Sequence, residues 1–75
     1  MELNEFIVKF AEQFDDTDSS EIKADTYYKE LDEWSSLSSM CIIAMVKTDF
    51  KKTITGKEIR ECDTVEDLYH LISEK

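Results

Sequence analysis

The stretch Leu31-Asp-Glu-Trp-Ser-Ser-Leu37 ends a long loop and leads into the apolar run Met40-Cys-Ile-Ile-Ala-Met-Val46. Ser35 suits the N-cap position of a helix, since its hydroxyl can accept a hydrogen bond from an unpaired amide of the first turn. We therefore predict a helix that begins at Ser35 or Ser36 and ends near Asp49.

Apolar side chains surround almost the whole of this predicted helix. One stripe holds Leu37, Met40, Cys41 and Ala44. The other faces carry Ile42, Ile43, Met45 and Val46. A helix that is apolar nearly all round either lies at the centre of a core or offers one face to partners. Because Met40, Ile43 and Val46 cannot all face one small core, we expect at least one of them to be exposed.

Three further helices are predicted on either side of this segment. Apolar residues at spacings of three and four mark the first helix: Leu3, Phe6, Ile7, Phe10 and Phe14. Short polar residues from Asp15 to Ser20 should stop it. The pattern Thr55-Gly-Lys-Glu58 fits a capping box that opens a short helix through Cys62. Asp63-Thr-Val-Glu66 opens a last helix, whose stripe is Val65, Leu68, Tyr69 and Ile72.

The segment from Asp15 to Ser35 has no persistent period and is predicted to be a loop. We expect a few apolar anchors to tie it down: Ile22, one or both of Tyr27 and Tyr28, and Leu31. A single helical turn is expected around Lys29 to Asp32. The predicted fold is therefore a single all-α domain over residues 1–75, a four-helix bundle of three main helices and one short helix with a long first loop.

The charge of the chain excludes some classes of function. Of its 75 residues, 18 are Asp or Glu and 9 are Lys or Arg, which gives a net charge of −9. Nucleic-acid binding needs the opposite charge balance, because Lys and Arg replace the counterions of the phosphates. With no Pro and one Gly, the chain has too little turn chemistry for a β-sandwich or barrel. Acidic residues crowd two parts of the loop, Asp15/Asp16/Asp18/Glu21 and Glu30/Asp32/Glu33.

The residues that could carry catalysis or bind a metal are few. Cys41 and Cys62 are not spaced as a CxxC pair, and His70 is the only histidine, so a zinc site is not expected. His70 falls on the polar side of the last helix, where we expect a solvated side chain rather than a catalytic one. The longest apolar run is far too short to span a bilayer, and no signal peptide is evident. We expect a soluble cytoplasmic protein with reduced thiols.

A calcium-binding loop is a weak alternative for the first acidic cluster. Asp16, Asp18 and Ser20 have the alternating spacing of the first ligands of an EF-hand loop. That loop requires Gly at its sixth position and Glu at its twelfth, where this chain has Glu21 and Tyr27. No metal site is therefore expected.

The serines at the start of the second helix allow a more specific interpretation. A helix N-terminus has unpaired amides and a partial positive charge, so it suits a bound or attached phosphate. Taken alone, this local pattern is better explained by serines that simply cap the helix.

The whole chain resembles the acyl carrier protein family, the small four-helix carriers of fatty-acid and polyketide synthesis. The family has Asp-Ser-Leu at the start of its second helix, where this chain has Ser35-Ser36-Leu37. The resemblance covers essentially all 75 residues. It also includes Glu21-Ile22, Tyr28, Phe50, Ile54, Glu58, Asp63-Thr64-Val65 and Leu71-Ile72.

This resemblance implies that Ser36 carries a covalent 4′-phosphopantetheine arm. A phosphopantetheinyl transferase would attach the arm from coenzyme A, and the thiol of the arm would hold an acyl group as a thioester. The protein itself would not be an enzyme. Its partners would be the transferase and enzymes that move or condense acyl groups, namely a ketosynthase, an acyltransferase or an acyl-activating enzyme. We expect the carrier to be a monomer.

Several residues depart from the family pattern. Ser35 replaces the usual aspartate, and Glu33 and Trp34 stand where the family often has Gly and a small residue. Trp34 is either a contact for partners or a packing residue at the helix base. The second helix is usually acidic, but here Asp49 is its only carboxylate. We therefore expect an apolar docking face for partners of a specialised pathway, formed by Trp34, Ser35, Leu37, Met40 and Ile43.

Two alternatives remain for the function, and two for the interior. The chain could be a carrier-like protein that is never modified, or an unrelated acidic helical adaptor; both would act only as interaction modules. A pocket for the acyl chain between the second helix and Ile54, Ile59 and Leu68 is plausible. Those residues are equally explained as ordinary core, which we prefer.

Overall fold

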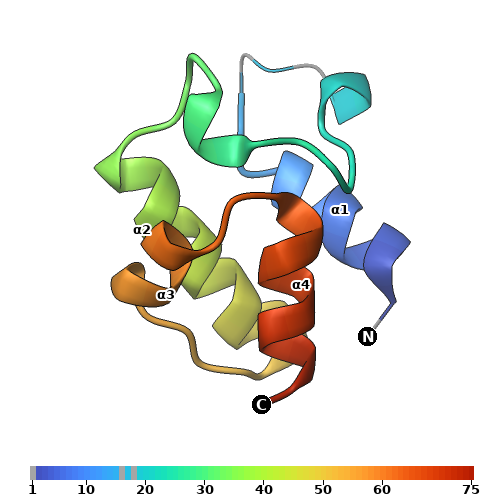
Figure 1. The fold of residues 1–75 in the computed structure, drawn as a ribbon, viewed down its shortest axis with the longest axis vertical. Coiled ribbons are helices and arrows are strands. Elements are labelled where there is room, and N and C mark those ends of the chain that lie inside the picture. The colour runs from blue at the N-terminus through green and yellow to red at the C-terminus, as the bar shows by residue number, and fades with distance from the viewer. Residues whose placement is uncertain (1, 16, 18) are drawn as a thin grey trace.

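The described part of the chain folds as a small bundle of four α-helices. The computed structural model describes residues 2–15, 17 and 19–75. The helices are α1 (Leu3–Ala11), α2 (Ser36–Met45), α3 (Gly56–Glu61) and α4 (Val65–Ser73), arranged as in Figure 1. Two 3₁₀ turns, η1 (Ser19–Glu21) and η2 (Tyr28–Glu30), lie in the long loop, and a π-helical segment, η3 (Val46–Phe50), extends α2. The all-α fold predicted from the sequence is thus confirmed.

Strand structure is confined to one isolated contact in these ranges. An antiparallel bridge pairs Tyr27 in the loop with Thr64 before α4. Of the helices in the described ranges, none is long and apolar enough to cross a membrane.

Helix α1 presents the predicted apolar stripe to the core but ends earlier than the stripe does. The α-helix stops at Ala11 because the side-chain amide of Gln13 donates to the carbonyl of Lys9, 3.1 Å away. The chain then continues in tighter turns, in which the backbone amide of Phe14 donates to the carbonyl of Ala11. These turns keep Phe14 on the buried side, next to Phe10.

The loop is anchored by two of the predicted residues. Ile22 and Tyr28 are buried, whereas Tyr27 is 55% exposed, so only one of the two tyrosines is an anchor. Leu31 is half-buried against the core. The single turn of helix spans Tyr28–Glu30, slightly before the predicted position.

Tyr28 connects the loop to two helices at once. Its hydroxyl donates to the carbonyl oxygens of Ile59 and Cys62, which share its one hydrogen. Its ring packs edge-on against Phe10, with the ring centroids 5.6 Å apart. It also packs at a tilted angle against Trp34, with the ring centroids 5.0 Å apart. The fully buried side chain therefore has both an apolar environment and acceptors for its polar group.

The loop also completes the N-terminus of α4. The first two amides of this helix, those of Val65 and Glu66, donate to the carbonyl oxygens of Thr26 and Ala24, at 3.1 and 2.9 Å. Thr64 forms the predicted helix start as a capping box, so the third amide is paired as well. The amides that a helix end normally leaves unpaired are thus all satisfied by the protein.

Helix α2 differs from its prediction at the C-terminal end. The α-helix ends at Met45, and the segment to Phe50 has the wider π-helical turn instead. This segment places the ring of Phe50 against that of Phe6, with the two ring centroids 5.8 Å apart. Lys51 then adopts a left-handed backbone with φ of 57°, which ends the helical segment.

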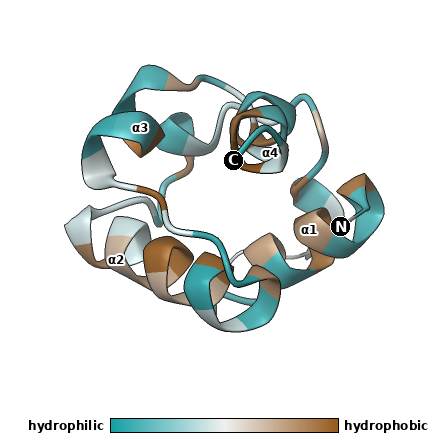
Figure 2. Ribbon diagram, turned by 90° about the horizontal axis from the view of Figure 1, so that it is seen from below, coloured by the Kyte–Doolittle hydropathy of each residue, from teal (hydrophilic) through white to brown (hydrophobic). Residues whose placement is uncertain are grey.

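The centre of the bundle is filled with aliphatic side chains. Five of these side chains are fully or almost fully buried: Ile42 of α2, Val46 of η3, Ile54, Ile59 of α3 and Leu68 of α4. Ile54 lies in the connection between η3 and α3. The ribbons of Figure 2 surround this interior. The structure therefore bears out the core interpretation of Ile54, Ile59 and Leu68.

We predict that Tyr28→Phe destabilises the protein by about 1–3 kcal/mol, because it removes the donor of two buried carbonyl groups while leaving the ring in place. Urea denaturation measures this change in the free energy of unfolding. Tyr27→Phe is the matched control, since Tyr27 is exposed and its loss of a hydroxyl should change stability by less than about 0.5 kcal/mol. Equal effects of the two variants would contradict the anchoring role.

The same anchor should make stability depend on pH in the alkaline range. Burial raises the pKa of Tyr28 above its ordinary value, and the negative charges of nearby acidic groups raise it further. The unfolded state therefore loses the tyrosine proton first, near pH 10, so the stabilisation is complete below that pH and declines above it. Tyr28→Phe should lessen the decline in melting temperature between pH 9 and 11.

Candidate functional site

The start of α2 is held by a reciprocal pair of serines. Ser35 is the N-cap, and its hydroxyl accepts from the amide of Ser38 at 3.4 Å. The Ser38 hydroxyl lies 3.3 Å from the amide of Ser35 and accepts from it, and it donates to the carbonyl of Glu33 at 3.1 Å. Both hydroxyls therefore pair with backbone groups at the start of the helix, and Ser38 is buried there. The N-cap predicted at Ser35 is confirmed.

Ser36 is placed differently from these two serines. It is the first residue of α2 and is exposed to solvent. Within the described part of the chain, its hydroxyl makes no hydrogen bond. The hydroxyl is therefore available for reaction.

The first two amides of α2 are open as well. Those of Ser36 and Leu37 have no acceptor among the described residues, in contrast to the amides of Val65 and Glu66 at α4. Unpaired amides and the helix dipole make this position favourable for an anion. A phosphodiester on the Ser36 oxygen would lie beside them.

The Trp34 side chain, just before this helix start, packs against the core. Its ring packs against Tyr28 at 5.0 Å and against Phe14 at 6.1 Å, and it is half-buried. The packing alternative for Trp34 is thus observed, and a contact of its exposed part with partners stays a prediction.

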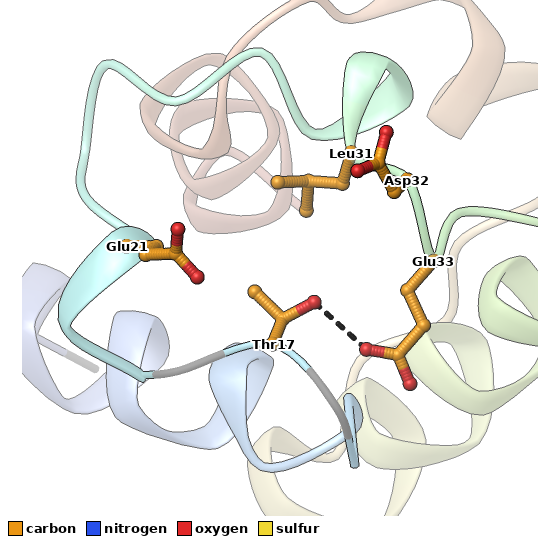
Figure 3. A pocket seen from close by; sticks show the side chains of 5 residues that line it. All are labelled: Thr17, Glu21, Leu31, Asp32 and Glu33. Atoms are coloured by element: carbon orange, nitrogen blue, oxygen red, sulfur yellow. Dashed lines mark hydrogen bonds between the residues drawn. The ribbon is translucent and has the colours of Figure 1, made fainter.

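Glu33 joins the start of α2 to the loop after α1. Its carboxylate accepts from the amide of Asp15 at 3.0 Å and from the Thr17 hydroxyl at 2.7 Å, the bond drawn in Figure 3. Sequence reasoning did not anticipate this role for Glu33, because its two partners lie 16 and 18 residues away. The structural role of Ser38 was also missed, since Ser is a rare partner for Ser in a capping box.

Acidic residues from both parts of the loop, Glu21 from the first and Asp32 and Glu33 from the second, line one hollow near the start of α2. The hollow has a volume of about 470 Å³ and is lined by Thr17, Glu21, Leu31, Asp32 and Glu33, as in Figure 3. No group of three or more potential metal ligands occurs among the residues that the structure describes. Asp16 and Asp18, which entered the calcium-loop comparison, lie outside the described residues.

The solvent face of α2 is apolar and uncharged. Leu37 is 68% and Met40 65% exposed, Ala44 is exposed, and Ile43 is half-buried. The prediction that at least one apolar residue of this helix is exposed is confirmed by Met40. From Ser36 to Met45 the helix carries no charged side chain.

The remaining reactive side chains do not form a group with Ser36. His70 is exposed on α4, as predicted, with its ring against Tyr69. Cys62 is buried, and burial raises the pKa of its thiol, which lowers its reactivity. Cys41 on α2 is half-buried, and both cysteines are free thiols.

Comparisons of the chain with models of protein families, with curated proteins and with solved structures gave no match.

We predict that the three serines differ in their effect on stability. Ser35→Ala should cost about 1 kcal/mol through the lost cap. Ser38→Ala should cost about 1–2 kcal/mol, because it leaves the partly buried amide of Ser35 and carbonyl of Glu33 without this partner. Ser36→Ala should change stability by less than about 0.5 kcal/mol. Urea denaturation of the three variants checks this order, and a large loss in Ser36→Ala would show that its hydroxyl is structural.

Proposed function

We propose that this protein is an acyl carrier protein whose 4′-phosphopantetheine arm is attached to Ser36. The observation that carries the proposal is the exposed hydroxyl of Ser36 at the first position of α2, which makes no hydrogen bond to any residue that the structure describes. The other serines of this turn, Ser35 and Ser38, already use their hydroxyls in the helix cap. Ser39 is half-buried one turn further on, where no helix end is available to an anion.

The residues at this position fit the chemistry of the attachment. The Ser36 oxygen would attack the phosphorus of coenzyme A that bears the pantetheine group. The bond from this phosphorus to the second phosphate would break, adenosine 3′,5′-bisphosphate would leave, and a base of the transferase would take the serine proton. The resulting phosphodiester keeps one negative charge, which the open amides of Ser36 and Leu37 favour.

The carrier would act by tethering rather than by catalysis. A thioester on a flexible arm stays at high effective concentration for any enzyme that binds the carrier. The bundle beneath the arm needs a rigid attachment point, which Trp34 and the Ser35–Ser38 pair provide. These features support a carrier more directly than an enzyme.

The uncharged face of α2 supports an apolar mode of docking. Leu37, the residue after Ser36, and Met40, about one turn further along α2, are both exposed, with Ile43 half-buried. A ketosynthase, acyltransferase or acyl-activating enzyme with a matching apolar patch would bury these side chains and release their hydration water. The phosphopantetheinyl transferase would meet Ser35 and Trp34 next to its target serine.

The second candidate is an interaction module that is never modified. It would use the same apolar face of α2, so Leu37 and Met40 do not separate the two functions. Ser36 does separate them, because an adaptor has no need of a free hydroxyl at this position.

We predict that a phosphopantetheinyl transferase with coenzyme A modifies wild-type protein once, at Ser36. Ser36→Ala should abolish the modification and stay folded, whereas Ser35→Ala and Ser39→Ala should keep it. Intact-mass spectrometry and peptide mapping provide the measurement. A group mapped to Ser35, Ser38 or Ser39, or an unmodified wild-type chain from its native host, would contradict the proposal.

We predict that Met40→Glu weakens acyl transfer from a cognate partner about tenfold or more, because a charge at the centre of an apolar contact loses hydration without a counter-charge. Thr48→Glu is the matched control, since Thr48 is exposed in the segment after α2 and receives the same charge. Steady-state transfer rates and melting temperatures of both variants give the result. Unchanged transfer by Met40→Glu would remove the apolar docking face.

A further inference from the structure

The exposed side of α2 is an apolar stripe without any charge. Leu37, Met40 and Ala44 lie three and four residues apart, so they share one face of the helix. All three side chains are exposed, and Figure 2 shows α2 at the outer edge of the bundle. Covering apolar surface that faces water in this way is favourable.

Charges of opposite sign lie on the two sides of this stripe. Asp32 and Glu33, which we call the acidic segment, come just before α2. Lys47 and Lys51, the basic segment, come just after it and are exposed, with Asp49 as the one carboxylate between them. Neither lysine makes an ion pair with any residue that the structure describes. The charge along this part of the chain is therefore negative, then absent, then positive.

This order of charges is complementary to itself when two copies run in opposite directions. In an antiparallel pair of α2 helices, the acidic segment of each copy faces the basic segment of the other, at both ends of the contact. Such a contact uses the same surface on both copies about a two-fold axis, which is the commonest arrangement in homodimers. A parallel pair would instead place like charges together.

The sizes of the exposed side chains select the register of the pair. Met40 is the longest side chain of the stripe, and it fits over Ala44 of the second copy, the smallest. Helix periodicity then places Lys47 opposite Leu37 of the second copy, where the aliphatic stem of the lysine covers the leucine. Lys51 follows about one turn later, at the level of the acidic segment of the second copy.

The contact is small, so the pairing is weak. A helix of ten residues is about 15 Å long, and one such helix from each copy buries less than the roughly 1,200 Å² of a stable interface. The net charge of −9 on each copy also opposes association. The monomer expected from the sequence is therefore the form at low concentration, and the dimer forms as the concentration approaches the millimolar range.

We propose that two copies of this chain associate through antiparallel α2 helices, with Met40 against Ala44 at the centre and Lys51 near Asp32 at each end. The pairing covers the apolar stripe and lies beside Ser36. Its consequence for the carrier rests on the proposed function, because the stripe is also the docking face for partner enzymes. A paired copy has this face covered, so the partners act on the monomer and self-association holds unused carrier out of reach.

Sedimentation velocity of the unmodified protein, from micromolar to millimolar concentration, tests the pairing. A reductant keeps the free thiol of Cys41 on α2 from forming a disulfide. Wild type should shift from monomer to dimer as its concentration rises. Asp32→Lys and Lys51→Glu should each weaken dimerisation by roughly fivefold or more, because each variant turns two attractive contacts into repulsive ones. Melting temperatures check that the variants stay folded.

The double variant Asp32→Lys/Lys51→Glu tests the antiparallel orientation. It exchanges the two charges and keeps the net charge at −9, so opposite charges again face each other and dimerisation should return. Lys23→Glu is the matched control for Lys51→Glu, since Lys23 is exposed in the long loop and receives the same change in charge. It should change dimerisation by less than about twofold, because charges outside the contact are screened by salt.

Asp32→Lys separates the pairing from a general effect of charge. It reduces the net charge from −9 to −7, since one positive charge replaces one negative charge, so general repulsion predicts stronger association where the pairing predicts weaker. Wild type that stays monomeric at millimolar concentration, or a double variant that does not regain the dimer, overturns the pairing. If wild type stays monomeric while Met40→Glu weakens acyl transfer, the stripe serves partner enzymes alone. None of these outcomes touches the proposed function, which depends on modification of Ser36.

Discussion

The buried hydroxyl of Tyr28 is the contact on which the arrangement around α2 depends. It satisfies the carbonyl groups of Ile59 and Cys62, at the end of α3, from a residue in the middle of the long loop. The ring of Tyr28 also packs against the ring of Trp34. Trp34 immediately precedes the N-cap of α2, so a loop anchor sets the position of the candidate site. The neighbouring Tyr27 faces solvent and does not share this role, whereas Lys29 adds an exposed bond from its ammonium group to the carbonyl of Arg60.

The first turn of α2 and its N-cap contain two serines with a structural role and one serine whose hydroxyl is available for reaction. Ser35 and Ser38 pair with each other and with the backbone, and the carboxylate of Glu33 ties the same segment to the loop after α1. Ser36 lies between them and makes none of these bonds. A carrier needs this combination, because the attachment residue must be accessible while its backbone stays fixed for the enzymes that recognise it.

The charges of the chain lie away from α2. The net charge of −9 comes from the loop and the other helices, whereas α2 carries no charged residue. Repulsion between these charges opposes association of chains with one another, and the uncharged face leaves α2 free for apolar contacts. In the proposed function, recognition by partners would therefore depend on the shape of the patch around Leu37 and Met40 more than on a pattern of acidic residues.

Local chemistry alone determined most of the helices. Helix starts at Ser35, Thr55 and Thr64 could be predicted because a capping side chain acts on amides of the next turn, and such interactions are visible in the sequence. The apolar stripe of α1 was predictable for the same reason, since its period follows from helix geometry. The end of α1 was not, because it depends on a side-chain bond of Gln13 that competes with the helix.

The tertiary contacts determine which polar groups have hydrogen-bond partners and which side chains face solvent. The sequence by itself determined an acidic all-α chain with serines at the start of an apolar helix. It could not tell which face of that helix turns to water, because α2 is apolar nearly all round and only packing against α1 and α3 selects Ile42 over Met40. It could not reveal the Glu33 bond to Thr17 either. These features join residues that are distant along the chain, and such distances become short only when the core has closed.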